Sequence, residues 1–349
     1  MSDFTSPIPA PSTTHGPLSF GQILDRTYKL GRDNWKLFFG IASVPSAAIL
    51  LVFAALIGCV IPIAGPAIAA AQASAGHVSV APPAFPPFLI VGMMLVTYPI
   101  LFLVFALYMP AASYAATEAD RGVKVTIGSA YGRALNRFWR YLWLMILPVF
   151  YVIVPLVVIG VAIAVGALLM NHSSGGAGAM NAAASPAALF FLIPLILLLY
   201  VCLFVYCVWL MLRFAVAFPA SAMEGLTAWA SLQRSVKLTK GAKGRIFLVL
   251  LVVYAITYAV NLVLMMILFV VGAAGAGVAI LAHVAVGSAA FFILIGLAVL
   301  GYLLVLVACT MFSYVAYTTT LAVIYNDQRL RKDGPLLSMH ATPQPGEAL

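Results

Sequence analysis

The sequence predicts an all-α integral membrane protein with six transmembrane helices and three amphipathic helices on the cytoplasmic side. Its composition, the length of its apolar runs and the distribution of its basic residues support this fold class. Of the 349 residues, 64% are hydrophobic and 8% are charged, whereas a soluble domain carries about 25% charged residues. A surface with so little charge is expected to face lipid, because it could not remain in water.

Six apolar runs are long enough to cross a bilayer, since a helix needs about 20 apolar residues to span the hydrocarbon core. We expect the spans near Leu37–Ile63, Phe88–Ala112, Leu142–Met170, Ala187–Leu212, Ile246–Gly272 and Ala289–Phe312. The last run is expected to continue as a helix toward Asn326. Prolines occur inside several runs, and membrane helices tolerate them because neighbouring groups satisfy the freed carbonyls.

The basic residues predict the orientation of these spans. All 18 Lys and Arg residues lie before the first run, between the second and third, between the fourth and fifth, or after the sixth. The three alternate loops, Ala64–Pro87, Asn171–Pro186 and Ala273–Ser288, contain none. The positive-inside rule places the basic side in the cytoplasm. We therefore expect a multi-pass protein of the bacterial inner membrane with both termini cytoplasmic.

The three basic segments also predict an internal repeat. Each contains a Ser or Thr followed seven residues later by Arg, and an apolar run begins about a dozen residues after that. The pairs are Ser19 with Arg26, Thr126 with Arg133, and Thr227 with Arg234. The expected membrane domain covers residues 18–334, with repeats near 18–115, 125–217 and 226–326 and pseudo-threefold symmetry. Disordered tails are expected at 1–17 and 335–349.

Each repeat is predicted to open with an amphipathic helix. In the first copy Phe20, Ile23, Leu24 and Tyr28 share one helical face, and the opposite face is basic. Apolar and aromatic residues opposite Lys and Arg are typical of a helix that lies in the headgroup plane. The Ser or Thr at the start of each copy is a suitable N-cap.

The basic face is expected to bind anionic phospholipid, and a membrane or cytoplasmic protein partner is also conceivable. The candidate anion-binding residues are Arg26, Arg133, Arg234, Lys237, Lys240 and Arg245. General headgroup contact is one interpretation, and a ring of the three repeat arginines around a pseudo-threefold axis is the other. The candidates for structural polar pairs are Asp25, Arg213, Glu224, Asp327 and Arg329. Glu224 is expected to pair with Arg213 or Arg234.

Polar residues inside the runs form stripes at helical spacing. Tyr254, Tyr258 and Asn261 share one face of the fifth run. Similar stripes occur in the fourth run at Tyr206 and Arg213, and in the sixth at Thr310, Tyr314 and Tyr317. Hydrogen bonds between helices would explain these stripes, and so would a polar cavity within the bundle.

No sequence feature indicates catalysis. No Asp or Glu lies within a run, which disfavours proton-coupled transport and intramembrane proteolysis. Phosphate-binding, dinucleotide-binding and nucleophile-elbow motifs are absent, and the basic clusters lack the soluble context of a nucleic-acid binder. His77, His172 and His283 fall one in each uncharged loop. Their positions are out of register with the repeat, so no metal or cofactor is expected.

Three stretches carry a resemblance to a known family. They are Ser19–Thr27, the segment from Glu224 through Leu232–Gly241 to Arg245, and Tyr325–Arg329 with Arg331–Gly334. Over about residues 18–334 the chain resembles the membrane domain of some bacterial glycerophosphoryl diester phosphodiesterases and related six-span inner-membrane proteins. The phosphodiesterase activity belongs to a separate soluble domain, which is absent from this sequence. The resemblance therefore implies a six-span fold without that enzyme activity.

Two functions are compatible with these observations. The first is a non-enzymatic membrane protein that organises lipids or partner proteins through its basic cytoplasmic face. The second is a transporter or permease for a lipid-like or small amphipathic molecule, which would use the polar stripes inside the spans.

Overall fold

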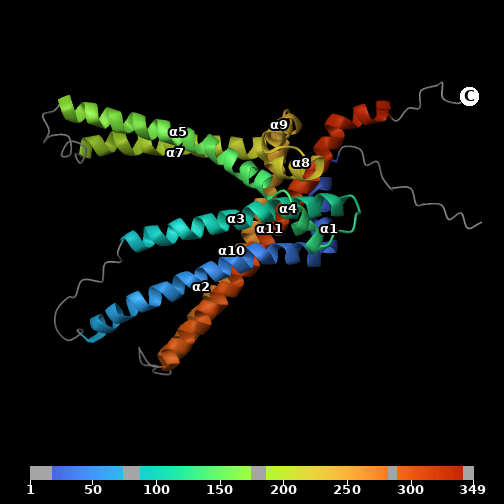
Figure 1. Ribbon diagram of the computed structural model, residues 1–349. Helices are drawn as coiled ribbons and strands as arrows, with labels where there is room; N and C mark the ends of the chain where they lie inside the picture. Colours follow the sequence, from blue (N-terminus) through green and yellow to red (C-terminus); the bar gives the residue numbers. More distant parts are fainter. Residues whose placement is uncertain (1–17, 74–86, 174–185, 282–288, 341–349) are drawn as a thin grey trace, which may run out of the picture.

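In the computed structural model, the described residues are 18–73, 87–173, 186–281 and 289–340, and every regular element within them is an α-helix (Figure 1). Six of these helices are long and apolar enough to cross a membrane. The predicted all-α class and the six apolar helices are therefore confirmed. The chain is a multi-pass membrane protein.

The six long helices each contain one predicted apolar run. They are α2 (Trp35–Ala73), α3 (Pro87–Asp120), α5 (Phe138–Ser173), α7 (Pro186–Phe214), α10 (Lys243–Leu281) and α11 (Ala289–His340). Two of them extend into segments expected to be loops, since α2 ends at Ala73 rather than Ile63 and α10 at Leu281 rather than Gly272. Alanine explains the extension of α2, because it has the highest helix propensity and fills most of the added segment.

The helix α11 also runs past its expected end, through the predicted domain boundary at residue 334 to His340. Ion pairs one turn apart support this extension, because Arg331 pairs with Asp327 and Arg329 with Asp333. Residues 335–340 are helical, so the expected tail does not begin at 335. The segments 1–17 and 341–349 lie outside the described residues.

Three short helices precede pairs of long ones. They are α1 (Phe20–Asp33), α4 (Ile127–Leu135) and α9 (Ala228–Thr239). The predicted N-caps are confirmed, because the side chains of Ser19, Thr126 and Thr227 each accept a hydrogen bond from a backbone N–H three residues on. A fourth short helix, α8 (Ala217–Glu224), was not predicted. It ends at Gly225, whose φ of 67° suits glycine.

All four short helices gather at one end of the molecule (Figure 1), which we call the basic end. The order of one short helix followed by two long helices occurs three times, at α1–α3, α4–α7 and α9–α11. The long helices meet at the basic end, where α2, α5 and α10 begin, and α5 and α7 diverge from the others toward the far end. The pseudo-threefold relation of the three units stays a prediction.

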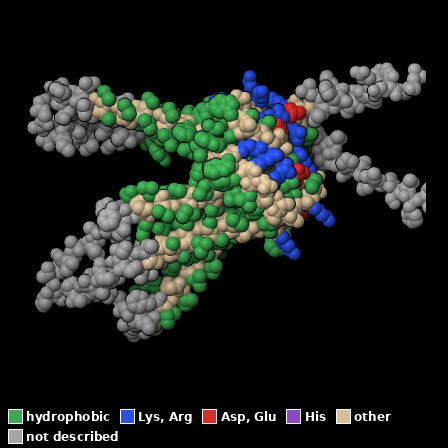
Figure 2. Space-filling model, in the orientation of Figure 1, with side chains coloured by type: hydrophobic (Ala, Val, Ile, Leu, Met, Phe, Trp, Pro, Cys, Tyr) green, Lys and Arg blue, Asp and Glu red, His purple; other side chains and the backbone are tan. Residues whose placement is uncertain are grey.

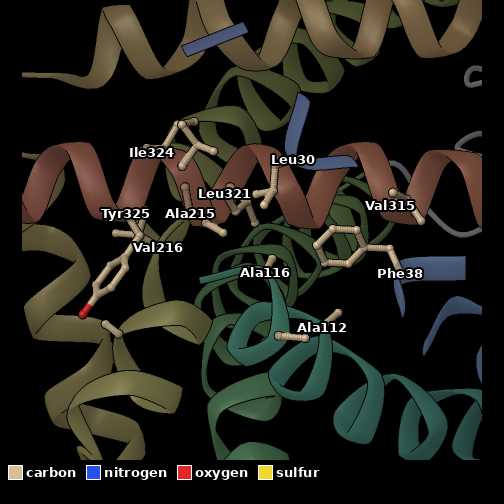
Figure 3. Close-up of a cluster of buried hydrophobic side chains, with 14 of the residues drawn as sticks. Leu30, Phe38, Ala112, Ala116, Ala215, Val216, Val315, Leu321, Ile324 and Tyr325 are labelled. Carbon is tan, nitrogen blue, oxygen red and sulfur yellow. The ribbon is translucent and has the colours of Figure 1, made fainter. Parts of the chain in front are cut away.

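The hydrophobic core lies toward the basic end (Figure 3). It contains Phe38, Ala112, Ala116, Val315 and Tyr325 from the long helices, together with residues of the short ones. The short helices thus bury apolar residues against the bundle, including Ile23 and Leu30 of α1, Ala130 and Ala134 of α4, and Leu238 of α9. Farther along the spans most large apolar side chains are exposed. This distribution is expected where lipid replaces protein as the neighbour.

Candidate functional site

Lysine and arginine side chains collect at the basic end, as Figure 2 shows for the visible face. All five tryptophans belong to the same end, and each is at least 39% exposed. They are Trp35, Trp139, Trp143, Trp209 and Trp229. Exposed tryptophan is typical of the boundary between headgroups and hydrocarbon. Sequence reasoning missed this belt, although the spacing of tryptophan near the span ends was a usable signal.

The three repeat arginines have different partners. Arg26 of α1 binds Asp120 at the end of α3, with its Nε 2.6 Å from Oδ1 and its Nη2 donating to the backbone carbonyl at 3.0 Å. Asn326 of α11 donates to the other carboxylate oxygen of Asp120 at 2.7 Å. Arg26 therefore joins α1 to α3 and α11, and its charge is balanced by a buried carboxylate.

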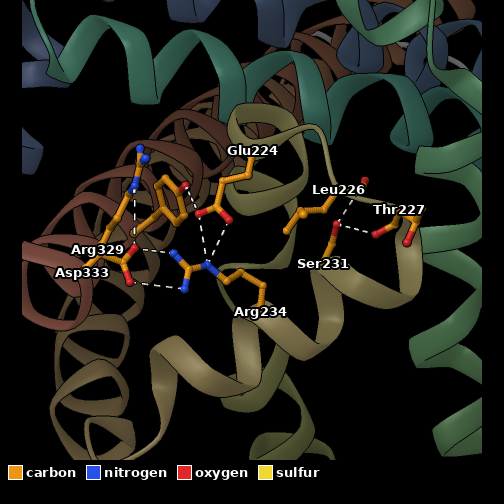
Figure 4. Close-up of polar contacts among 8 residues, drawn as sticks. Glu224, Leu226, Thr227, Ser231, Arg234, Arg329 and Asp333 are labelled. Atoms are coloured by element: carbon orange, nitrogen blue, oxygen red, sulfur yellow. Dashed lines mark hydrogen bonds and ion pairs between the residues drawn. The ribbon is translucent and has the colours of Figure 1, made fainter. Parts of the chain in front are cut away.

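Arg234 of α9 lies between two carboxylates (Figure 4). Its Nε is 3.0 Å from Glu224 of α8, and its Nη atoms donate to Asp333 of α11. The hydroxyl of Tyr325 donates to Glu224 at 2.9 Å. Partial burial lowers the pKa of Arg234, but hydrogen bonds with Asp333 and Glu224 outweigh it, so the pKa is raised above its usual value. Arg234 thus remains charged.

Arg213, the other partner considered for Glu224, has aromatic neighbours instead. Its guanidinium lies over the ring of Trp209, 5.0 Å from the centroid. Its backbone carbonyl accepts a hydrogen bond from Ser235 of α9 at 3.0 Å. Arg213 therefore stabilises the end of α7 rather than the α8–α11 contact.

Asp327 is the most enclosed acid among the described residues. Its side chain is 0% exposed, its Oδ2 is 3.0 Å from Arg331 and 3.6 Å from Arg245, and its Oδ1 accepts from the backbone N–H of Leu18 at 2.8 Å. Arg245 and Arg331 also donate to the carbonyl of Leu18. Asp327 and its two arginines thus fix the start of α1 to α10 and α11. Arg245, a candidate anion ligand, has a structural role here.

The other predicted residues lie at the surface. Asp25 pairs with Lys29 at 2.7 Å, and Arg329 lies 3.9 Å from Asp333. Lys237 and Lys240 are exposed, and neither has a described carboxylate within 4.0 Å. These two lysines are therefore available to an anionic surface.

Arg133 of α4 differs from the other two repeat arginines, because it lines an open polar cleft. The cleft has a volume of about 470 Å³, and its walls are Tyr114, Ser129, Gly132, Arg133, Asn136 and Arg137. The guanidinium of Arg133 lies over the ring of Tyr114, 4.4 Å from the centroid. This contact holds the charge in place without neutralising it.

No described carboxylate lies within 4.0 Å of Arg133, Arg137 or Lys124. The nearby acid Glu118, one turn beyond Tyr114 on α3, forms no ion pair within the described part of the chain. The three bases are exposed, so they present uncompensated positive charge. An anion can approach the cleft without displacing an internal partner.

A second cavity lies within the spans, between α10 and α11. It has a volume of about 480 Å³, and it brings together most of the polar residues predicted for these two helices. Its polar lining consists of Tyr254, Thr257, Tyr258, Asn261, Ser313, Tyr314 and Tyr317. Met109 of α3, Leu250 and Val253 complete the wall.

Two residues of the predicted polar stripes lie outside this cavity. The hydroxyl of Tyr206 on α7 donates to the backbone carbonyl of Tyr151 on α5 at 2.9 Å. The hydroxyl of Thr310 donates to the carbonyl of Val307 within its own helix. For these two, hydrogen bonding alone accounts for the polar side chain.

The described residues contain no cluster of His, Cys, Asp and Glu that could hold a metal ion. His77 and His283 lie outside the described residues, and the side chain of His172 is not described either. A comparison with protein-family models finds no match, and comparisons with curated proteins and with solved structures find none.

Proposed function

We propose that this protein is a non-enzymatic membrane protein that binds anionic phospholipid at its basic end and thereby organises lipids or partner proteins. The cleft at Arg133 and Arg137 is the observation that carries the proposal. It offers two arginines that form no ion pair with a described residue, and the side-chain amide of Asn136 lies beside them. Arginine and an amide N–H together suit a phosphate oxygen.

The exposed tryptophans support a headgroup position for this cleft. Trp139 and Trp143 at the start of α5 are 72% and 55% exposed, and they follow Arg137 closely in the chain. Indole side chains favour the level of the headgroups, so the adjacent arginines would lie at the height of lipid phosphates. The cleft lies near the C-terminal end of α4, and the last carbonyls of this helix carry partial negative charge. This position weakens anion binding slightly.

The proposal includes a bacterial inner-membrane location with the basic end and both termini in the cytoplasm. We expect reporter fusions after residues 75, 178 and 283 to show periplasmic activity, because the segregation of all 18 basic residues favours this orientation. Fusions after residues 122 and 226 serve as the matched cytoplasmic set. A cytoplasmic signal from any of the first three positions would contradict the six-span topology.

We expect the double variant Arg133→Gln, Arg137→Gln to bind phosphatidylglycerol roughly thirtyfold more weakly, since each of the two bases near an anionic surface contributes about 1 kcal/mol. Native mass spectrometry of the purified protein, with phosphatidylglycerol and phosphatidylcholine in competition, measures the retained lipid. The matched control is Asp25→Asn, Lys29→Gln, which removes an exposed ion pair at the same end and leaves the net charge unchanged.

Equal retention of the two lipids by the unmodified protein would overturn the proposed function. Equal losses in the double variant and the control would show that the cleft has no special role. Arg26→Gln and Arg234→Gln are less suitable for this measurement, because both residues already bind carboxylates. A site built from all three repeat arginines is accordingly not part of the proposal.

A second candidate function is transport of a lipid-like or small amphipathic molecule. The cavity between α10 and α11 favours it, because polar side chains gather there on spans that otherwise expose apolar residues. Packing of α10 against α11 does not by itself require such a cavity, because tyrosine and valine side chains could have filled this space.

A further inference from the structure

The α10–α11 cavity contains a hydrogen-bond acceptor that has no partner among the described residues. The amide nitrogen of Asn261 donates to the hydroxyl of Ser313 at 3.0 Å, and that hydroxyl donates to the carbonyl of Cys309 at 2.8 Å. Because the only proton of the Ser313 hydroxyl is used by Cys309, this oxygen can only accept from Asn261. The orientation of the amide follows, and it leaves Asn261 Oδ1 buried without a hydrogen bond.

An unmet acceptor is costly at this depth. The start of α10 at Lys243 precedes Tyr254 by about 16 Å of helix and Asn261 by about 27 Å, at 1.5 Å per residue. Both residues therefore lie well beyond the basic end, inside a span of 36 residues. Hydrocarbon offers no hydrogen bonds, so an unsatisfied polar group there costs several kcal/mol. The carbonyl of Asn261 has no donor within the described part of the chain, so a bound molecule is a suitable source of one.

Two tyrosines at the same cavity are open to their surroundings. Tyr254 is 52% exposed and Tyr258 is 70% exposed. The ring of Tyr254 lies 6.1 Å from that of Tyr317, measured between centroids. Tyrosine hydroxyls at the headgroup level find polar partners in water and lipid headgroups. The hydroxyls of Tyr254 and Tyr258 lie deeper in the span, where a bound molecule would have to supply such partners. A molecule in the cavity can reach these hydroxyls from the bilayer without crossing the basic end.

The lining also limits the chemistry of the ligand. None of the cavity residues carries an ionisable acid or base that is charged at neutral pH, so a charged head would be desolvated without a counter-ion. Met109, Leu250 and Val253 provide an apolar surface for a chain. A volume of about 480 Å³ falls within the range of small-molecule sites.

We propose that the α10–α11 cavity binds a neutral lipid with a hydroxyl head group, whose O–H donates to Asn261 Oδ1 once rotation of the amide turns this enclosed atom toward the cavity, while its chain packs on Met109, Leu250 and Val253. A single-chain lipid fills a concave cavity of this size better than the convex surface of a neighbouring helix would. This site is separate from the Arg133 cleft, so it stands or falls independently of phospholipid binding at the basic end. It also supplies a ligand class for the second candidate function without requiring transport.

The test uses the full chain in lauryldimethylamine oxide, a detergent without hydroxyl groups. Monoolein and methyl oleate have the same acyl chain, but only monoolein has hydroxyls. We expect native mass spectrometry to show at least tenfold tighter binding of monoolein. Asn261→Leu, which keeps a similar volume, should abolish this preference, and Tyr254→Phe should reduce it. Tyr302→Phe is the matched control, because Tyr302 is an exposed tyrosine of α11 outside the cavity.

Equal binding of the two lipids by the unmodified protein would overturn the proposal. So would Asn261→Leu converting a dimer to a monomer, since Asn261 would then pair with a second copy. If Asn261→Leu does not accumulate, an undiminished preference in Tyr254→Phe contradicts the proposal, and a reduced one supports it. The Arg133→Gln, Arg137→Gln variant should bind monoolein normally, which separates this site from the basic end.

Discussion

Asp327→Ala is expected to reduce the free energy of unfolding by about 3 kcal/mol, because removing one partner of a buried ion pair leaves the other uncompensated. The carboxylate is fully buried and accepts from the backbone of Leu18 and from Arg331, with Arg245 at 3.6 Å. Its removal leaves two arginines without a carboxylate partner and the backbone N–H of Leu18 without its acceptor, although both arginines still donate to the carbonyl of Leu18. The arginines are about 26% and 31% exposed, so water recovers part of the loss and the value falls at the low end for buried pairs.

Equilibrium unfolding in mixed micelles with increasing sodium dodecyl sulfate measures this loss. Limited proteolysis adds a local readout, because α1 should detach first when Leu18 loses its partner. The matched control is Asp25→Ala, which removes a carboxylate that is 59% exposed and paired with an equally exposed lysine. That change should cost at most about 0.5 kcal/mol. Equal losses from both variants would show that Asp327 does not hold α1 in place.

The spans and the basic end could be predicted because both depend on local sequence. Twenty apolar residues in succession have one stable arrangement in a bilayer, and Ser19, Thr126 and Thr227 cap helices through contacts three residues away. Helix ends were less predictable. The segment after Ile63 is apolar, rich in alanine and without charge, so its sequence suits a loop or a continued helix equally well.

The partners of the arginines could not be predicted, because they are distant in the sequence. Arg26 and Arg234 follow the same motif, yet the first binds Asp120 of α3 and the second binds Glu224 and Asp333. A periodic pattern specifies the face on which an arginine lies and says nothing of the helix opposite. The pairing of Glu224 with Arg234 is the exception, because it was one of the two pairings expected for Glu224 and only ten residues separate the two.

In both candidate sites, the residue spacing could be predicted from the sequence, but the contacts with distant helices could not. The polar stripe at Tyr254, Tyr258 and Asn261 is visible as spacing, but the free acceptor at Asn261 depends on Ser313, which no stripe included. Likewise, the repeat spacing identifies Arg133 as a candidate anion ligand. Its distinguishing property, a cleft with no described ion pair, depends on the acids of other helices.

Arg234→Gln is expected to reduce the free energy of unfolding by about 2 kcal/mol, because breaking a partly buried ion pair leaves its partners uncompensated. Glu224 and Asp333, which Figure 4 shows on either side of the guanidinium, would then lose their shared positive partner. Tyr325 would remain as the only described hydrogen-bond donor to Glu224. The loss should be smaller than for Asp327→Ala, since all three side chains of the network are 18–24% exposed.

A rescue experiment separates the charge effect from a packing effect. Adding Glu224→Gln and Asp333→Asn to Arg234→Gln removes the two uncompensated carboxylates, so most of the lost stability should return in mixed-micelle unfolding. The matched control is Arg329→Gln, which affects a looser contact of 3.9 Å with the same Asp333 and should cost at most about 0.5 kcal/mol. If the triple variant is no more stable than Arg234→Gln alone, the guanidinium contributes through packing between α9 and α11, and the electrostatic explanation is wrong.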